Sequence, residues 1–84
     1  MPYYVYIIQC VDGSLYTGYT SNLDARARLH ANGRGARYTK MHKPREVAYF
    51  EQFGSRSEAM RREKVIKKLT HLQKMALINS RKIP

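Results

Sequence analysis

The chain opens with the sequence YYVYIIQCVDGSLYTGYT, residues 3–20, which decides how the rest of the protein folds. Residues 3–10 are rich in β-branched and aromatic side chains, and residues 15–20 have the same character. Between them, the dipeptide Asp12-Gly13 is typical of a tight turn between two strands. The stretch therefore predicts a β-hairpin at the start of the chain.

The segment after the hairpin predicts one helix and one long basic loop. Ser21 or Asn22 is suited to cap a helix, and Gly33 with Gly35 would end it. Residues 33–45 are then expected to form a loop that carries basic side chains and no acidic ones.

The second half of the chain predicts one more strand and two more helices. Residues 46–53 have the composition of a strand. Ser55 and Glu58 form the sequence pattern of a capping box, in which each side chain satisfies a backbone N–H of the first helical turn. Thr70 and Gln73 repeat that pattern and predict a short final helix.

The expected order of elements is ββαβαα. An antiparallel hairpin mixed with helices in so short a chain indicates the α+β class, with a small three-stranded antiparallel sheet flanked by helices. At 84 residues there is room for one hydrophobic core, so residues 1–84 are expected to form a single domain.

The composition indicates a polyanionic partner. Sixteen Lys and Arg against six Asp and Glu give a formal net charge of +10. Basic residues are spread along the whole chain beside seven tyrosines, which favours nucleic acid over a membrane surface; solubility alone is the simpler alternative. The single cysteine, Cys10, and the missing export signal suit a cytoplasmic location.

The expected loop is the first candidate for the nucleic-acid interface. Its side chains combine positive charge with one aromatic ring, a combination that fits phosphate contacts beside a base-stacking platform. A merely solvated run of charge is the alternative. The proposed contact residues are Arg34, Arg37, Tyr38, Lys40 and Lys43.

Three polar residues lie on helix faces where solvent exposure is not expected. At 100° per residue, Arg26 and His30 share the face of the first helix that carries Leu23, so they point toward the sheet. Glu63 lies at the edge of the apolar stripe of the second helix, where a carboxylate must be paired, hydrogen-bonded or metal-bound. Arg26 and Glu63 are either two sides of one pocket or a structural ion pair. His30 has packing as its ordinary alternative.

The two hairpin strands carry Tyr4-Val5-Tyr6 and Tyr16-Thr17-Gly18. With Arg26 ten residues beyond Tyr16, His30 one turn later, and Glu63 on a later helix, the chain resembles the GIY-YIG nuclease family. The segment from Asp12 to Gly18 is similar to its short, single-domain bacterial branch. Taken alone, each tyrosine would be read as a half-buried residue of the sheet.

The resemblance implies a metal-dependent endonuclease that hydrolyses nucleic-acid phosphodiesters. It implies Glu63 as the ligand of one Mg²⁺ or Mn²⁺ ion and Tyr6 or Tyr16 as the base that activates water. Arg26 would lower the pKa of that tyrosine and stabilise the phosphate, and His30 would share the proton. DNA is preferred to RNA as the expected substrate, in repair or recombination, and a targeting protein partner is left open.

The mechanism makes one geometric demand on the hairpin. A two-residue Asp12-Gly13 turn would place Tyr6 and Tyr16 on opposite faces of the sheet, whereas a three-residue turn or a bulge would place them on the same face. We therefore predict the irregular turn. The competing functions are a non-catalytic DNA- or RNA-binding module with this fold, and a small subunit of a larger assembly.

Overall fold

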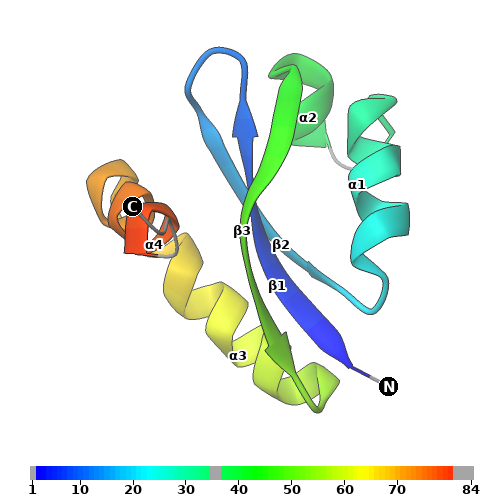
Figure 1. Cartoon of the computed structure of the whole chain (residues 1–84), viewed down its shortest axis with the longest axis vertical. Coiled ribbons are helices and arrows are strands. Elements are labelled where there is room, and N and C mark those ends of the chain that lie inside the picture. Colours follow the sequence, from blue (N-terminus) through cyan, green and yellow to red (C-terminus); the bar gives the residue numbers. More distant parts are fainter. Residues whose placement is uncertain (1, 35–36, 81–84) are drawn as a thin grey trace.

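The computed structural model of the protein describes residues 2–34 and 37–80, without the side chains of residues 39 and 40. It contains a three-stranded antiparallel sheet in the order β2-β1-β3, so the first strand is central. Helices cover both faces of this sheet (Figure 1). The elements are β1 (Tyr3–Cys10), β2 (Leu15–Thr20), α1 (Leu23–Ala31), α2 (Arg37–Met41), β3 (Pro44–Phe53), α3 (Arg56–Lys67) and α4 (His71–Ser80).

The predicted fold class and sheet are confirmed, but the expected loop over residues 33–45 was wrong in part. Residues Arg37–Met41 form the short helix α2, and β3 begins at Pro44, two residues earlier than expected. The helix is stabilised by its own aromatic pair, because the His42 ring stacks on the Tyr38 ring one turn back, with 4.3 Å between the ring centroids.

The central strand β1 divides the hydrophobic core into two layers. Val5 and Ile7 point to one face, where they belong to a cluster with Ala59 and Ile66 of α3 and Ile78 of α4. On the other face, Tyr6, Ile8 and Cys10 form a second cluster, with Tyr16, Leu23, Tyr38 and Val47 packed against it. Figure 1 shows α1 on one side of the sheet and α3 with α4 on the other.

The turn between β1 and β2 has three residues, as the mechanism required. The backbone N–H of Cys10 donates to Ser14 O at 2.8 Å, and Gly13 N–H donates to Cys10 O at 2.9 Å. Gly13 has a φ of 87°, the left-handed conformation that completes such a loop and that glycine adopts without strain. This turn pairs Tyr6 with Gly18 and Ile8 with Tyr16, so both catalytic tyrosine candidates lie on the same face.

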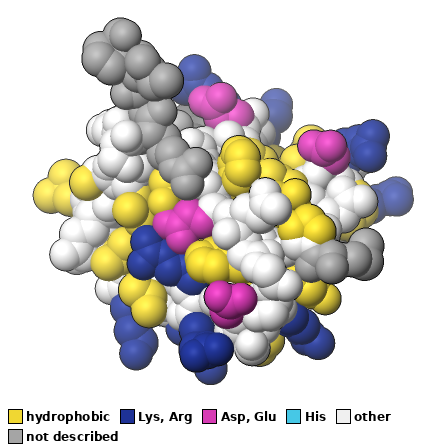
Figure 2. All heavy atoms as spheres, turned by 60° about the horizontal axis from the view of Figure 1, so that its bottom comes forward, with side chains coloured by type: hydrophobic (Ala, Val, Ile, Leu, Met, Phe, Trp, Pro, Cys, Tyr) yellow, Lys and Arg dark blue, Asp and Glu magenta, His cyan; other side chains and the backbone are white. Residues whose placement is uncertain are grey.

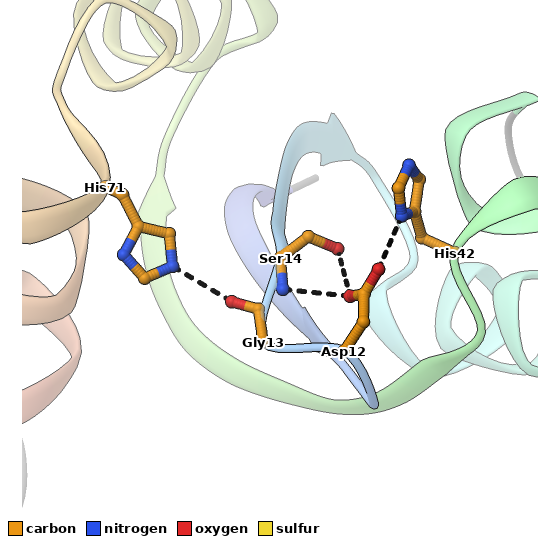
Figure 3. A network of polar contacts seen from close by, with 5 residues as sticks. All are labelled: Asp12, Gly13, Ser14, His42 and His71. Carbon is orange, nitrogen blue, oxygen red and sulfur yellow. Dashed lines mark hydrogen bonds and ion pairs between the residues drawn. The ribbon is translucent and has the colours of Figure 1, made fainter.

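Side chains from three segments hold this turn in place (Figure 3). Asp12 accepts hydrogen bonds from the backbone N–H and the hydroxyl of Ser14, at 3.0 and 2.6 Å. Its second oxygen lies 2.7 Å from Nδ1 of His42, at the end of α2. On the opposite side, Nε2 of His71 in α4 lies 2.9 Å from Gly13 O. The Ser14 and His42 contacts hold the pKa of the Asp12 carboxyl below its usual range.

The helix starts follow the sequence closely. Asn22, rather than Ser21, caps α1, because its side chain accepts a hydrogen bond from Ala25 N–H at 3.0 Å. Both capping boxes are present. Glu58 N–H donates to Ser55 Oγ, whose hydroxyl donates to Glu58 Oε1 at 2.9 Å. The Thr70–Gln73 pair closes in the same reciprocal way at the start of α4.

The surface is strongly basic but not uniformly so. In the view of Figure 2, Lys and Arg side chains lie mainly around the edge of the visible face, with hydrophobic side chains across its middle. None of the helices within residues 2–34 and 37–80 combines the length and apolar character that crossing a membrane requires.

Candidate active site

An open polar pocket at the β2 edge of the sheet collects most of the predicted site. Tyr6, Tyr16, Arg26 and Glu63 all line it. The first two come from the hairpin, Arg26 comes from α1 on one face, and Glu63 comes from α3 on the other. Residues separated by 57 positions in the sequence therefore meet around a single strand edge. The remaining lining residues are Tyr3, Gly18, Tyr19, Thr20, Ser21 and Arg56.

Gly18 makes this arrangement possible. It lies directly opposite Tyr6 in the hairpin, and a Cβ atom built on it would be 2.5 Å from the Tyr6 hydroxyl oxygen and 2.8 Å from Cζ. Those distances are far below ordinary contact, so the tyrosine ring occupies the space that a side chain at position 18 would need. The missing side chain lets the Tyr6 ring lie over the backbone of β2 and reach the pocket.

His30 does not line this pocket but contacts Tyr6, the catalytic candidate, directly. Its Nε2 is 3.0 Å from the Tyr6 hydroxyl, and both residues are 1% exposed. Burial, followed by the positive charge of Arg26, lowers the pKa of His30. The imidazole is therefore neutral at neutral pH and can accept a hydrogen bond or a proton from Tyr6.

Arg26 lowers the pKa of Tyr6 as expected, but the net pKa shift is upward. Burial raises the pKa of the Tyr6 phenol above its usual range, and the neighbouring Tyr16 raises it further. Arg26 acts in the predicted direction, but its effect is smaller than that of burial. Tyr6 is therefore a protonated phenol at neutral pH, hydrogen-bonded to a neutral histidine.

Tyr16 belongs to a row of aromatic rings on the same face. Its ring centroid lies 6.3 Å from that of Tyr6, 5.2 Å from that of His30 and 5.7 Å from that of Tyr38. Tyr38 in turn stacks on His42. This packing fixes the orientation of Tyr16 while leaving the side chain half-buried at the pocket.

Glu63 provides the acidic group of the pocket. Its side chain is 15% exposed, and its carboxylate pairs with Lys67 one turn further along α3, at 3.6 Å. Among the described residues, Glu63 forms its ion pair with Lys67 and not with Arg26. The structural Arg26–Glu63 ion pair is therefore not formed. Arg26 instead faces the same pocket from α1.

The donor set of the pocket fits a hard divalent cation. Mg²⁺ is usually held by one or two carboxylates, with water and substrate phosphate completing its coordination. Glu63 and the nearby phenols offer oxygen ligands in a polar, open pocket. Within residues 2–34 and 37–80 no group of three or more His, Cys, Asp or Glu side chains could hold a metal ion, and Glu63 is the acidic residue of the pocket lining.

The residues proposed as a nucleic-acid interface lie on and around α2, and none of those whose side chains are described lines the pocket. Arg34, Arg37 and Lys43 are exposed, as such contacts require. The Tyr38 ring is engaged by Tyr16 and His42, so it contributes to the packing of the aromatic row. The side chain of Lys40 lies outside the described residues.

Sequence reasoning missed Arg56. It is the first residue of α3 and lines the same pocket as Arg26. The signal in the sequence was the spacing between Arg56 and Glu63. Seven residues make about two helical turns, so the two side chains share a helix face.

Comparison with known proteins agrees with this geometry. The model of the GIY-YIG catalytic domain matches residues 2–76, so the chain belongs to this family of the nuclease superfamily. Among its relatives, a UPF0213 protein of Staphylococcus haemolyticus is 52% identical over 94% of this chain and 96% of its own length. A UPF0213 protein of Clostridium perfringens is 52% identical, covering 95% and 86%.

Two solution structures share the fold. A UPF0213 protein of Bacillus halodurans aligns with a TM-score of 0.62 and 43% identity, over all of this chain and 89% of the other. A protein of Enterococcus faecalis, EF2693, aligns with a TM-score of 0.64 and 36% identity, over 95% and 85%. The arrangement of sheet and helices is therefore common to the chain and both relatives.

Proposed function

We propose that the protein is a metal-dependent endonuclease that hydrolyses nucleic-acid phosphodiesters, with DNA preferred to RNA. The observation that supports it most is the meeting of Tyr6, Tyr16, Arg26 and Glu63 around one open pocket. Hydrolysis of a phosphodiester needs a proton-transfer group, a cation that binds the phosphate and a carboxylate that binds a metal ion. A reducing cytoplasm suits the buried free Cys10.

Arg26 is the group that stabilises the phosphate in this proposal. Its guanidinium lines the pocket with Glu63 and Tyr6, and a planar guanidinium binds two phosphate oxygens at once. The phosphate gains negative charge as water attacks it. A fixed cation beside that charge lowers the barrier more than it stabilises the substrate.

Tyr6 and His30 handle the proton. The attacking water gives its proton to the Tyr6 oxygen while the Tyr6 hydroxyl proton passes to Nε2 of His30, 3.0 Å away. The lowered pKa of His30 keeps it neutral and ready to accept. This relay needs no free phenolate in the resting protein, which the raised pKa of Tyr6 disfavours.

Glu63 would hold one Mg²⁺ or Mn²⁺ ion. When bound, such an ion polarises the phosphate and lowers the pKa of water. The Glu63 side chain is largely buried, pairs with Lys67 and lines the pocket. DNA repair or recombination is the setting in which we place the activity, and a targeting protein partner remains part of the proposal.

A second candidate is a non-catalytic nucleic-acid-binding module. The observation that favours it is the protonated state of Tyr6 together with the single carboxylate of the pocket. The net charge of +10 serves either function equally.

A cleavage assay distinguishes the two candidates. Branched, nicked, flapped and single-stranded DNA and single-stranded RNA are incubated with the protein in Mg²⁺, in Mn²⁺ and in excess chelator. The nuclease cuts at least one substrate in a divalent cation and none in chelator. Tight, salt-sensitive binding without cutting on every substrate would establish the binding module instead.

A further inference from the structure

Arg56 is a second guanidinium at the pocket, and it comes from a different element than Arg26. It is the first residue of α3, directly after the N-cap Ser55. Its Nε and Nη2 lie 3.3 and 3.2 Å from the hydroxyl oxygen of Tyr19, and its Cζ lies 6.0 Å from the centre of the Tyr19 ring. Arg56 and Tyr19 both line the pocket.

We propose that Arg56 binds a second phosphate of the nucleic-acid strand, a few nucleotides from the one held at Arg26, and that Tyr19 positions its guanidinium. This inference rests on the proposed function, because it assigns a further contact of the same strand. Arg56 would contribute to affinity and to placement of the strand, and it takes no part in proton transfer.

The partner of Arg56 separates it from the structural arginine of the same helix. Arg62 donates from Nε and Nη2 to both oxygens of Glu51, at 2.8 and 3.0 Å, so its charge is matched by a carboxylate within the protein. The group that accepts from Arg56 is the hydroxyl of Tyr19 and not a carboxylate. Arg56 is exposed, and a guanidinium has five N–H donors, so donors remain for a phosphate.

The charge of the pocket fits this assignment. Arg26 and Arg56 are the basic residues of its lining and Glu63 is the acidic one, whose own charge is partly matched by Lys67. Two guanidinium groups in the lining of one pocket favour an anion with more than one charged group. A strand of nucleic acid presents such groups at regular intervals.

The spacing along α3 fits a single strand. Arg56 and Glu63 lie on the same helix face, about 10 Å apart along its axis at ~1.5 Å per residue. With a rise of about 3.4 Å per nucleotide of a strand, a phosphate within roughly three nucleotides of the one at Glu63 would reach Arg56. The contact is therefore to the same strand that is cut.

The test measures binding, so it does not depend on cutting. A labelled DNA oligonucleotide, as a single strand and as a duplex, is titrated with full-length Glu63→Gln protein at several salt concentrations. Arg56→Ala and Arg61→Ala are then compared in that background. Arg61 is the matched control, because it loses the same charge from the same helix on the side away from Glu63, where its Nε contacts the Ser57 carbonyl at 3.4 Å.

We expect Arg56→Ala to reduce the steepness with which the logarithm of the binding constant falls with the logarithm of the salt concentration. The reduction should be about 0.9 for duplex DNA or about 0.7 for a single strand, the value of one phosphate contact. Arg61→Ala should leave the slope unchanged. Equal slopes for the two variants, with the parent binding normally, would overturn the role of Arg56 alone. Failure of the parent to bind either DNA would overturn the proposed function together with this inference.

The positioning role of Tyr19 has its own readout. Tyr19→Phe keeps the ring and removes the hydroxyl that accepts from Arg56. It should weaken binding severalfold when Arg56 is present and have no effect in the Arg56→Ala protein, because the two act as a unit. Equal effects of Tyr19→Phe in both proteins would show that Tyr19 contributes only to packing.

Discussion

The Tyr6 hydroxyl lies 3.0 Å from Nε2 of His30, and this contact joins the central strand to α1. Both residues are almost completely buried, and in both cases burial is the main cause of the pKa shift, upward for Tyr6 and downward for His30. The fold thus keeps two neutral groups side by side. Their protonation states are a property of the core as much as of the site.

The pH dependence of stability should report the buried state of His30. Its folded-state pKa is lower than the ordinary value of about 6.5. Below that pH the unfolded chain binds a proton that the folded protein resists, so stability falls as pH decreases and levels off once the folded protein is also protonated. Above about pH 7 the histidine contributes no pH dependence.

Urea unfolding at about pH 7.5 and at about pH 5.5 measures this effect. The wild-type protein should lose more stability between the two values than His30→Gln, which cannot take up that proton. His71→Gln is the control for an exposed histidine of α4. An identical pH dependence in wild type and His30→Gln would contradict a lowered pKa at His30.

Gly18 should not tolerate even the smallest side chain. In Gly18→Ala the new Cβ would lie 2.5 Å from the Tyr6 hydroxyl oxygen, so the ring must move. We expect a loss of about 1–3 kcal/mol of stability, typical of overpacking, and a large loss of cutting because the Tyr6–His30 contact is displaced.

Chemical denaturation and a cleavage assay check the Gly18 prediction. Gly54→Ala is the matched control, because a Cβ there has Glu58 Oε1 at 3.9 Å as its nearest neighbour, an ordinary contact. A Gly18→Ala protein as stable and active as Gly54→Ala would show that the Tyr6 ring need not lie over this position.

Sequence patterns predicted the local features well because each depends on neighbouring residues. The hairpin and both capping boxes follow from residues close to one another in the sequence. The three-residue turn was predicted from function, since only that register places Tyr6 and Tyr16 on one face. The Asp12-Gly13 dipeptide by itself suited a shorter turn.

The features that the sequence did not predict depend on contacts between distant segments. The short helix α2 was missed because its basic residues resembled a loop, whereas its Tyr38 ring packs against Tyr16 of β2 and His42. The net pKa shift of Tyr6 depends on how deeply α1 and the sheet bury it, which no spacing reveals. Arg56 carried only its distance from Glu63 as a signal.

Arg62 should prove structural, not part of the nucleic-acid interface. It binds Glu51 through two hydrogen bonds, and Tyr49 donates to the same carboxylate. Removing it in Arg62→Ala should cost about 1.5–3 kcal/mol, the range for hydrogen bonds to charged groups, while the salt dependence of DNA binding stays unchanged.

Thermal or urea unfolding alongside DNA binding tests this assignment, with Arg61→Ala again as the surface control. Arg61 is exposed, and its Nε contacts a backbone carbonyl of its own helix. A variant Arg62→Ala that is fully stable but binds DNA with a smaller salt slope would place Arg62 in the interface.

The turn geometry can be tested at Gly13. Its φ of 87° lies in the left-handed region, where a residue with a Cβ costs about 1–2 kcal/mol. Gly13→Ala should lower the free energy of unfolding by about that amount and leave the DNA-binding slope unchanged. Unchanged stability would indicate that the turn adopts another conformation in solution.

The central claim is that Tyr6 and Glu63 act at one hydrolytic site, and single-turnover cleavage tests it most directly. On the best substrate in Mg²⁺ or Mn²⁺, Tyr6→Phe and Glu63→Gln should each cut at least about 100-fold more slowly than wild type. Both should still bind DNA, and Glu46→Gln, which removes an exposed carboxylate, should cut normally. Cutting at the wild-type rate by both Tyr6→Phe and Glu63→Gln would contradict the account.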